Sequence, residues 1–291
     1  MPHIPVLLKE VLETLNPKPG EFFIDGTFGN GGHAAEIAKR IKPNGIFLAV
    51  DWDKNAIKMA AVKMKSYELR KLVFANGNYA NIPDVLKKNK LPKADGLLLD
   101  LGFSSEQIEG RGLGFSFRRD EPLLMVYGEK QKPVHLWLED LSEKELAGII
   151  GKFGGERYAA RVARAIKKNL PIKTTGRLAA IVENVLPKNY EHGRIHPATR
   201  TFLALRVFAN SELENLEKIL LALPEFIKSK GRVAIISYNS LEDRIVKTIF
   251  NNFYRQKKAT LFAKKPITPS DGEIKENSRA RSAKLRVIEF Q

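Results

Sequence analysis

A glycine-rich turn stands where the first predicted strand meets the first predicted helix. The segment Asp25-Gly-Thr-Phe-Gly-Asn-Gly-Gly-His33 includes Gly29-x-Gly31-x-x-Ala34, which fits the loose form of a nucleotide-binding fingerprint. Glycines permit a tight turn and let backbone amides approach a ligand closely. The same pattern also occurs at an ordinary strand-to-helix turn, so the turn alone leaves both interpretations open.

Two aspartates follow the second predicted strand. Asp51 and Asp53 stand at the distance from the turn at which a carboxylate binds ribose hydroxyls in nucleotide-binding folds. Asp53 can instead cap the helix that follows. Together the turn and the acids predict a ligand of the adenosine type, without separating a nicotinamide nucleotide from S-adenosylmethionine.

A third polar segment, Asp95-Gly-Leu-Leu-Leu-Asp-Leu-Gly-Phe-Ser-Ser-Glu-Gln107, contains the fourth predicted strand and the turn after it. In enzymes that methylate amines, a polar residue and an aromatic residue at this place hold the acceptor amine. Here these would be Asp100, Phe103, Ser104 and Ser105. The alternative is a turn that is merely rich in small residues.

The elements that must position these residues alternate between strand and helix. Apolar runs at 21–25, 46–51, 71–75 and 95–100 predict buried strands, and helical spacing follows at 34–41, 56–62 and 82–86. Nearly continuous apolar strands separated by helices predict an α/β fold with a parallel sheet covered on both faces.

The alternation stops near residue 105 and resumes near residue 200. Between them we predict helices at 141–150, with a Ser142/Glu145 capping box, at 158–166 and at 178–185. Later elements are predicted helices at 202–223 and 241–250, the second opened by a Ser240/Asp243 capping box, and strands at 232–237, 260–263 and 285–288. Residues 1–105 and 200–291 are therefore expected to form one discontinuous domain, and residues 106–199 a helical insertion.

The composition favours a polyanionic partner. The 291 residues include 49 lysines and arginines against 33 aspartates and glutamates, a formal net charge of +16. Such an excess is typical of proteins that bind nucleic acid, although a solvated basic surface is the alternative. The absence of cysteine excludes disulfides, thiolate metal sites and cysteine nucleophiles. No signal peptide or apolar run of about 20 residues is visible, so a cytoplasmic location is expected.

Several motifs resemble the ribosomal RNA small-subunit methyltransferase H family, also called MraW. They run through the whole chain in the family's order and comprise His3-Ile-Pro-Val-Leu-Leu-Lys-Glu10, Asp25–His33, Asp100–Gln107, Gly114-Phe-Ser-Phe117, His196-Pro-Ala-Thr-Arg-Thr-Phe202, Ser240-Leu-Glu-Asp-Arg244 and Ser278-Arg-Ala-Arg-Ser-Ala-Lys284. The resemblance implies a class I, Rossmann-like methyltransferase fold with a helical insertion, and we expect the insertion to recognise RNA. It also implies S-adenosylmethionine as cofactor and N4 of a cytidine in the decoding region of 16S ribosomal RNA as acceptor, with the small ribosomal subunit as partner.

Carried over by motif, the resemblance implies cofactor contacts at Gly31, Gly32, His33, Asp51, Tyr79, Asp100 and Gln107. An aromatic ring such as that of Tyr79, after the third strand, can stack on adenine. Ser104 and Asn239 are candidate catalytic residues, as acceptors for the hydrogens of the amine.

Two departures from the family pattern concern the acceptor. After Gly-Phe-Ser-Phe the family usually has Pro-Leu-Asp-Met-Arg-Met, where this chain has Pro122-Leu-Leu-Met-Val-Tyr127 and so loses an acid at Leu124 and a base at Val126. The family's Phe-His before Ser-Leu-Glu-Asp-Arg is Tyr238-Asn239 here. Both departures lie outside the cofactor motifs and bear on acceptor positioning.

Basic residues of the insertion are candidates for RNA contacts. Arg157, Arg161, Arg164 and Lys168 share one helical face, which fits either a phosphate-binding stripe or a solvated face. Further candidates are Arg118, Arg119 and the tail residues Arg279, Arg281 and Lys284. His192 and His196 are four residues apart, but Gly193 and Pro197 predict a loop and no further ligand completes a set, so no metal site is expected.

Two other functions remain open at this point. A nucleotide-dependent oxidoreductase would share the glycine turn and the ribose-binding acid, but it would leave Asp100–Gln107 and the basic charge unexplained. A non-catalytic or altered-specificity RNA-binding relative would be consistent with the two departures.

Overall fold

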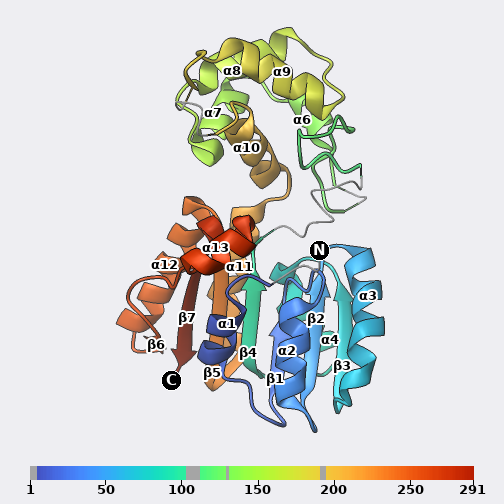
Figure 1. Ribbon diagram of the computed structural model, residues 1–291, viewed down its shortest axis with the longest axis vertical. Coiled ribbons are helices and arrows are strands. Elements are labelled where there is room, and N and C mark those ends of the chain that lie inside the picture. The colour runs from blue at the N-terminus through green and yellow to red at the C-terminus, as the bar shows by residue number, and fades with distance from the viewer. Residues whose placement is uncertain (1–4, 103–111, 129–130, 191–194) are drawn as a thin grey trace. The chain divides into compact units, whose positions relative to one another are not determined.

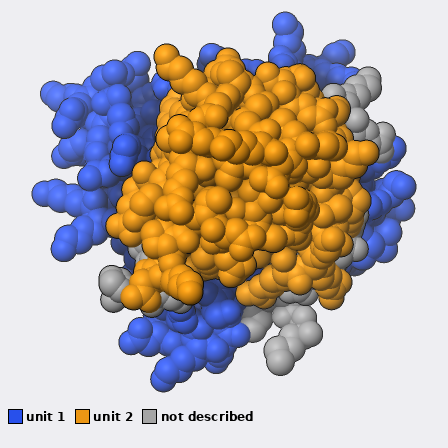
Figure 2. Space-filling view, turned by 90° about the horizontal axis from the view of Figure 1, so that it is seen from above, with its two compact units in different colours: residues 1–102, 213–291 blue, residues 103–212 orange. Residues whose placement is uncertain are grey.

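The computed structural model describes residues 5–102, 112–128, 131–190 and 195–291. The chain divides into two compact units. Unit 1 comprises Met1–Gly102 and Leu213–Gln291, and unit 2 comprises Phe103–Glu212; Figure 2 colours them separately. In the described part of the chain, no helix has the length and apolar character needed to cross a bilayer.

Unit 1 is built on a seven-stranded sheet with the order β3-β2-β1-β4-β5-β7-β6 (Figure 1). The strands are β1 (Phe22–Asp25), β2 (Ile46–Asp51), β3 (Lys71–Asn76), β4 (Ala94–Asp100), β5 (Ile227–Ser237), β6 (Ala259–Leu261) and β7 (Lys284–Phe290). The first five are parallel to one another, and β7 is antiparallel to both β5 and β6. This is the predicted α/β architecture, with the antiparallel pair added at one side.

Helices cover both faces of the sheet, which explains why the strands are apolar throughout. In β2, Leu48 and Val50 face one hydrophobic cluster and Phe47 and Ala49 face the other. The first cluster contains side chains of α4 (Ile82–Lys88), α11 (Glu212–Phe226) and α12 (Ser240–Arg255). The second contains side chains of α1 (Leu8–Leu15), α2 (Gly32–Ile41) and α3 (Lys54–Met64).

Unit 2 is helical in its described part and has its own core. Its helices are α6 (Val134–Asp140), α7 (Glu143–Gly154), α8 (Ala159–Lys168), α9 (Thr175–Val185) and α10 (Thr199–Ala209). Leu146, Val162 and Leu178 are fully buried in its hydrophobic cluster. The predicted capping box at the start of α7 is confirmed, because Ser142 and Glu145 each accept the other's backbone amide.

Two local predictions were wrong. The single helix expected over 202–223 is two helices, α10 and α11, separated at Asn210 and Ser211. Asn210 is buried, and its side-chain amide donates to the backbone carbonyls of Met125 and Arg206. Ser211 has a φ of 47°, so the helix cannot continue through it. Helix α12 is capped by Asn239 and not by Ser240, because the Asn239 carboxamide accepts two amides of the first turn.

The boundary of the insertion also differs from the predicted one at its end. Unit 2 includes α10 and extends to Glu212, whereas the sequence pattern assigned residues from 200 onward to the sheet domain. The start differs by only three residues, since unit 2 begins at Phe103.

Candidate active site

Three carboxyl groups lie at the ends of three adjacent parallel strands. Asp25, Asp51 and Asp100 are the last residues of β1, β2 and β4. Because β1 lies between β2 and β4, this edge of the sheet brings the three acids together. The carboxyl edge of a parallel sheet is where open α/β folds bind ligands.

The glycine-rich turn is held in place by the acid of the neighbouring strand. Gly29 donates its amide to Asp51 Oδ2 at 2.7 Å, and Asp53 donates its amide to Asp51 Oδ1 at 2.8 Å. Gly31 precedes α2 with a φ of 75°, and a Cβ there would lie 2.4 Å from the Phe28 ring. Glycine is therefore required at this position by both backbone conformation and space. Asp53 caps α3 through Asn55, the second role considered for it above.

Asp100 joins the turn to the fourth strand. Its backbone amide donates to Thr27 Oγ1 at 2.7 Å, and its Oδ2 lies 4.0 Å from His33 Nδ1. The His33 Nε2 lies 2.9 Å from the carbonyl of Val6, and since a carbonyl only accepts, Nε2 carries the proton. His33 is buried and so fixes the amino-terminal segment against the turn.

Tyr238 follows the last residue of β5 and meets the same carboxylate. Its hydroxyl is hydrogen-bonded to Asp100, and burial followed by the Asp100 charge raises the pKa of Tyr238 far above its usual value. Gly102 donates its amide to Asp100 Oδ1 at 3.0 Å, and a Cβ on Gly102 would lie 2.7 Å from the Tyr238 ring. The hydroxyl that distinguishes this chain from the usual phenylalanine therefore lies beside Asp100.

Tyr79 lies beside the turn as well. It begins a short 3-10 helix after β3, where Asn78 caps the turn by accepting the amide of Ala80. A Cβ on Gly26 would be 3.3 Å from the Cβ of Tyr79, so the two residues are neighbours at the end of β1. This position is consistent with the predicted stacking role.

Asp25 is a functional candidate that lies outside the residues implied by the motifs. It is 2% exposed, and burial raises its pKa to about 7, against the lowering effect of the Thr27 amide and with added repulsion from Asp100 and Asp51. The signal in the sequence was its position, directly at the end of the first strand and before the glycines.

The charge at this edge determines which adenosine ligand fits. A carboxyl group whose pKa is raised by burial and by two neighbouring acids is stabilised as a carboxylate by a nearby cation. S-adenosylmethionine carries a sulfonium and an ammonium group, whereas the pyrophosphate of a nicotinamide dinucleotide would be repelled. The residues present therefore fit S-adenosylmethionine. Among the described residues, no three His, Asp or Glu side chains are grouped so as to hold a metal ion.

The other predicted site residues either lie outside the described residues or have structural roles. Ser104 and Gln107, and with them Phe103 and Ser105, lie outside the described residues, as does His192. Gly32 begins α2, and a Cβ there would lie 2.4 Å from Pro5. The Asn239 carboxamide oxygen is engaged in capping α12 at 3.0 Å from two amides, which leaves it poorly placed to accept from a substrate amine.

The RNA contacts predicted on the insertion belong to unit 2 and lie on its surface, whereas the tail candidates Arg279, Arg281 and Lys284 belong to unit 1. Arg118, Arg119, Arg157, Arg161 and Arg164 are all exposed. Arg164 forms an ion pair with Glu143 at 3.2 Å, and the Arg157 guanidinium lies 5.0 Å from the centroid of the Tyr158 ring.

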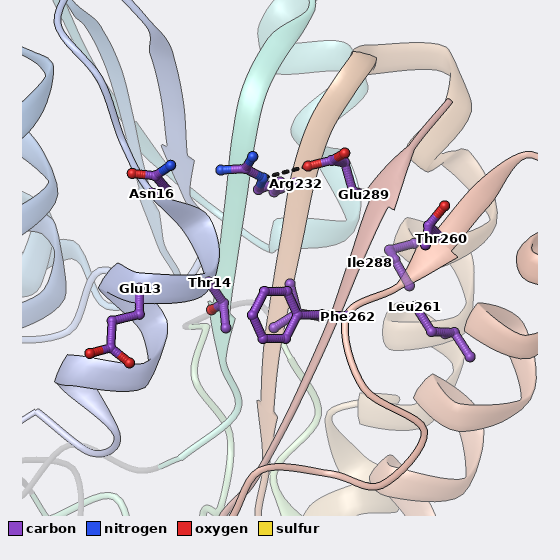
Figure 3. A pocket seen from close by; sticks show the side chains of 10 residues that line it. Glu13, Thr14, Asn16, Arg232, Thr260, Leu261, Phe262, Ile288 and Glu289 are labelled. Atoms are coloured by element: carbon purple, nitrogen blue, oxygen red, sulfur yellow. Dashed lines mark hydrogen bonds and ion pairs between the residues drawn. The ribbon is translucent and has the colours of Figure 1, made fainter.

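A cavity of about 330 Å³ lies elsewhere in unit 1, beside α1, β5 and β7 (Figure 3). Its charged side chains include Arg232 and Glu289, which are paired at 2.6 Å. Arg232 stands five residues before the end of β5, so the cavity is displaced along the strand from the acidic edge. We assign no ligand to it.

Comparison with known proteins identifies the family of the chain. The sequence matches the MraW methylase family over residues 1–291. The ribosomal RNA small subunit methyltransferase H of Fervidobacterium nodosum is 42% identical over 290 residues, covering 99% of this chain and 97% of the relative. The enzyme of that name from Syntrophus aciditrophicus is 40% identical over 306 residues, which cover 99% of this chain and 97% of the relative. The enzyme of that name from Thermotoga neapolitana is 41% identical over 292 residues, which cover 99% of this chain and 96% of the relative. The chain therefore belongs to the MraW methylase family of S-adenosylmethionine-dependent methyltransferases.

Proposed function

We propose that this protein transfers a methyl group from S-adenosylmethionine to the exocyclic N4 amine of a cytidine in the decoding region of 16S ribosomal RNA. The observation that carries the proposal is the acidic edge of unit 1, where Asp25, Asp51 and Asp100 surround the glycine-rich turn. The relatives named as small-subunit ribosomal RNA methyltransferases support the substrate class. The motif resemblance supplies the acceptor atom.

The cofactor would be held by the turn and by the strand ends around it. Asp51 would accept from the ribose hydroxyls, Tyr79 would stack on adenine, and Asp25 with Asp100 would stabilise the positive charges. Gly31, Gly32, His33 and Gln107 complete the contacts implied by the motifs. The bound cofactor supplies an electrophilic methyl group on a sulfonium, which leaves as neutral sulfur.

The acceptor amine needs positioning more than it needs a strong base. The N4 lone pair is delocalised into the cytosine ring, so the protein must hold N4 about 3 Å from the methyl carbon and in line with the sulfur. The nitrogen donates its lone pair to the methyl carbon and then releases one of its protons. Ser104 is our candidate to accept from the amine, and the capping role of Asn239 makes it the weaker choice.

Unit 2 is our candidate for RNA recognition, within the insertion expected at 106–199. Its exposed arginines, Arg118, Arg119, Arg157, Arg161 and Arg164, would contact phosphates. Bringing a cytosine to the methyl donor requires unstacking it, at a cost of about a few kcal/mol that basic contacts to surrounding RNA can offset. A free nucleoside cannot make those contacts, so we expect the assembled or nearly assembled small subunit, in the cytoplasm, to be the substrate.

Transfer of labelled methyl groups tests the proposal. The wild-type protein is incubated with methyl-labelled S-adenosylmethionine and small ribosomal subunits, and separately with free cytidine. We expect label in the RNA of the subunits and little in cytidine. A protein that binds subunits but transfers no label would instead be the non-catalytic relative.

A further inference from the structure

Unit 2 presents an aromatic stack at its surface that none of the roles above uses. Phe117 and His196 are stacked with ring centroids 4.5 Å apart and an interplanar angle of 29°. Phe117 is itself packed edge-on against Phe202 of the core, at 4.9 Å. His196 is exposed, so its outer surface is open to a ligand while Phe117 supports it from behind.

The imidazole of His196 is fixed in orientation. Its Nδ1 accepts the backbone amide of Ala198 at 3.1 Å, at the turn that leads into α10. An accepting Nδ1 is unprotonated, so the ring is the Nε2–H tautomer. The ring is therefore a plane whose rotation is restrained from two sides, and a ligand that stacks on it loses little side-chain entropy.

Positive charge follows this stack directly along the chain. Arg118 and Arg119 come immediately after Phe117, and both are exposed. Arg200 lies in the first turn of α10, four residues after His196. Its guanidinium donates to the carbonyl of Gly155 at 3.2 Å, and Gly155 stands two residues before Arg157 in the chain. The segment that contains His196 and Arg200 therefore contacts the chain next to Arg118 and Arg119, through Phe117, and the chain next to Arg157, through Gly155.

We propose that His196, supported by Phe117, is a stacking platform for an unpaired RNA base, with Arg118 and Arg119 neutralising the adjoining phosphates. Aromatic planes with interspersed arginines bind single-stranded nucleic acid through base stacking and backbone charge together. The proposal rests on RNA being the substrate class and adds a specific site for it on unit 2. The base bound here is a flanking nucleotide and need not be the one that is methylated.

The test separates stacking from charge by using two strands. Full-length protein is titrated with fluorescently labelled single-stranded oligouridine, and with an abasic ribose-phosphate strand of the same length. His196→Ala should weaken oligouridine binding roughly tenfold and leave the abasic strand nearly unchanged. His196→Phe keeps an aromatic plane on Phe117 and should restore most of the affinity.

The charge on the platform has its own variant and control. Changing Arg118 and Arg119 together to Gln should weaken both strands and lower the salt slope of log affinity by about 0.7 for each phosphate that is no longer neutralised. Changing Lys87 and Lys88 of α4 to Gln removes the same charge from exposed positions in unit 1 and should have a smaller effect. Circular dichroism of each variant verifies that the fold is retained.

The proposal is overturned if His196→Ala weakens both strands equally, or neither, in a folded protein. The readout is binding and not methylation. Oligouridine binding that depends on His196, in a protein that transfers no methyl group, would refute the proposed function while supporting the platform. Methylation by a protein whose oligouridine binding is unaffected by His196→Ala would support the proposed function and refute the platform.

Discussion

The acidic strand ends of unit 1 and the basic surface of unit 2 hold their charges in opposite ways. Asp25 and Asp51 are 2% and 7% exposed, and each accepts hydrogen bonds from backbone amides of the adjacent turn. Arg157 and Arg161 on unit 2 are exposed, and the Arg164 side chain is 63% exposed even with its Glu143 partner.

This difference fits the two kinds of ligand in the proposed function. A buried acid with fixed partners can bind one small molecule in one orientation, because its geometry is set before the ligand arrives. Exposed arginines on long side chains act mainly through summed charge, which suits a polyanion bound at many phosphates. The two regions should therefore respond to different perturbations, and the following experiments compare them.

The largest effect is expected from Asp51→Ala. The substitution leaves ribose hydroxyls without an acceptor and frees the Gly29 amide, so affinity for S-adenosylmethionine should fall by about 1–3 kcal/mol, or roughly five- to 150-fold. Isothermal titration calorimetry measures it. Asp53→Ala is the matched control, because Asp53 caps α3 and should alter stability more than affinity. Equal affinity of Asp51→Ala and wild type would contradict the assignment of this edge.

The pH dependence of cofactor binding should come next in size. Asp25, with a pKa near 7, is largely protonated below that pH, and a cationic ligand favours its carboxylate form. Affinity for S-adenosylmethionine should therefore fall as pH decreases below about 7, approaching tenfold per pH unit, and Asp25→Asn should flatten this dependence. A wild-type affinity that is independent of pH between 5.5 and 8 would show that Asp25 does not face the bound charge.

The same group has a consequence for stability with a defined sign. Its pKa is raised from 3.8 to about 7 in the folded state, so the folded state binds the proton more tightly than the unfolded state. The contribution of Asp25 to the free energy of unfolding is full below pH 3.8 and is lost as pH rises toward 7. A bound cation should restore it.

Substitutions on the surface of unit 2 should change the salt dependence of RNA binding and leave cofactor binding unchanged. Changing Arg157, Arg161 and Arg164 together to Gln should lower the slope of log affinity for small subunits against log salt by about 0.7–0.9 for each phosphate that these arginines neutralise. Affinity for S-adenosylmethionine should not change. An unchanged slope would show that this helix surface is only solvated, and would leave Arg118 and Arg119 as the main candidates.

The smallest effect is expected from Tyr238→Phe. The hydroxyl bond to Asp100 is removed while the ring and its packing on Gly102 remain, so the free energy of unfolding should decrease by about 0.5–1.5 kcal/mol. Urea denaturation measures it, with Tyr254→Phe as control because Tyr254 is 52% exposed. Equal decreases in the two variants would mean that the Asp100 bond adds nothing.

The sheet and the cofactor edge could be predicted well from the sequence because both depend on local patterns. Continuous apolar runs gave the strands, and the acids follow them directly, as with Asp51 at the end of β2. Fold class and family followed from the same residues and from the motifs. The importance of Asp25 was missed because its pKa depends on burial and on Asp100 and Asp51, which come from other strands.

Features that depend on tertiary contacts could not be predicted in this way. The break between α10 and α11 depends on Asn210 bonding to Met125, 85 residues earlier in the chain. The role of His196 depends on Phe117, which lies 79 positions before it; spacing alone had suggested only a comparison with His192, as metal ligands. Helices α1 and α6, of eight and seven residues, were not predicted.

The identity of the methylated atom is the most direct test of the proposed function. Small ribosomal subunits treated with the protein and S-adenosylmethionine are digested to nucleosides and analysed by mass spectrometry against authentic standards. We expect N4-methylcytidine, formed by wild type and greatly reduced by Asp51→Ala. Methyl groups found only on ring carbon C5, or only on ribose, would contradict the assignment of N4 while leaving the methyltransferase fold and its acidic edge in place.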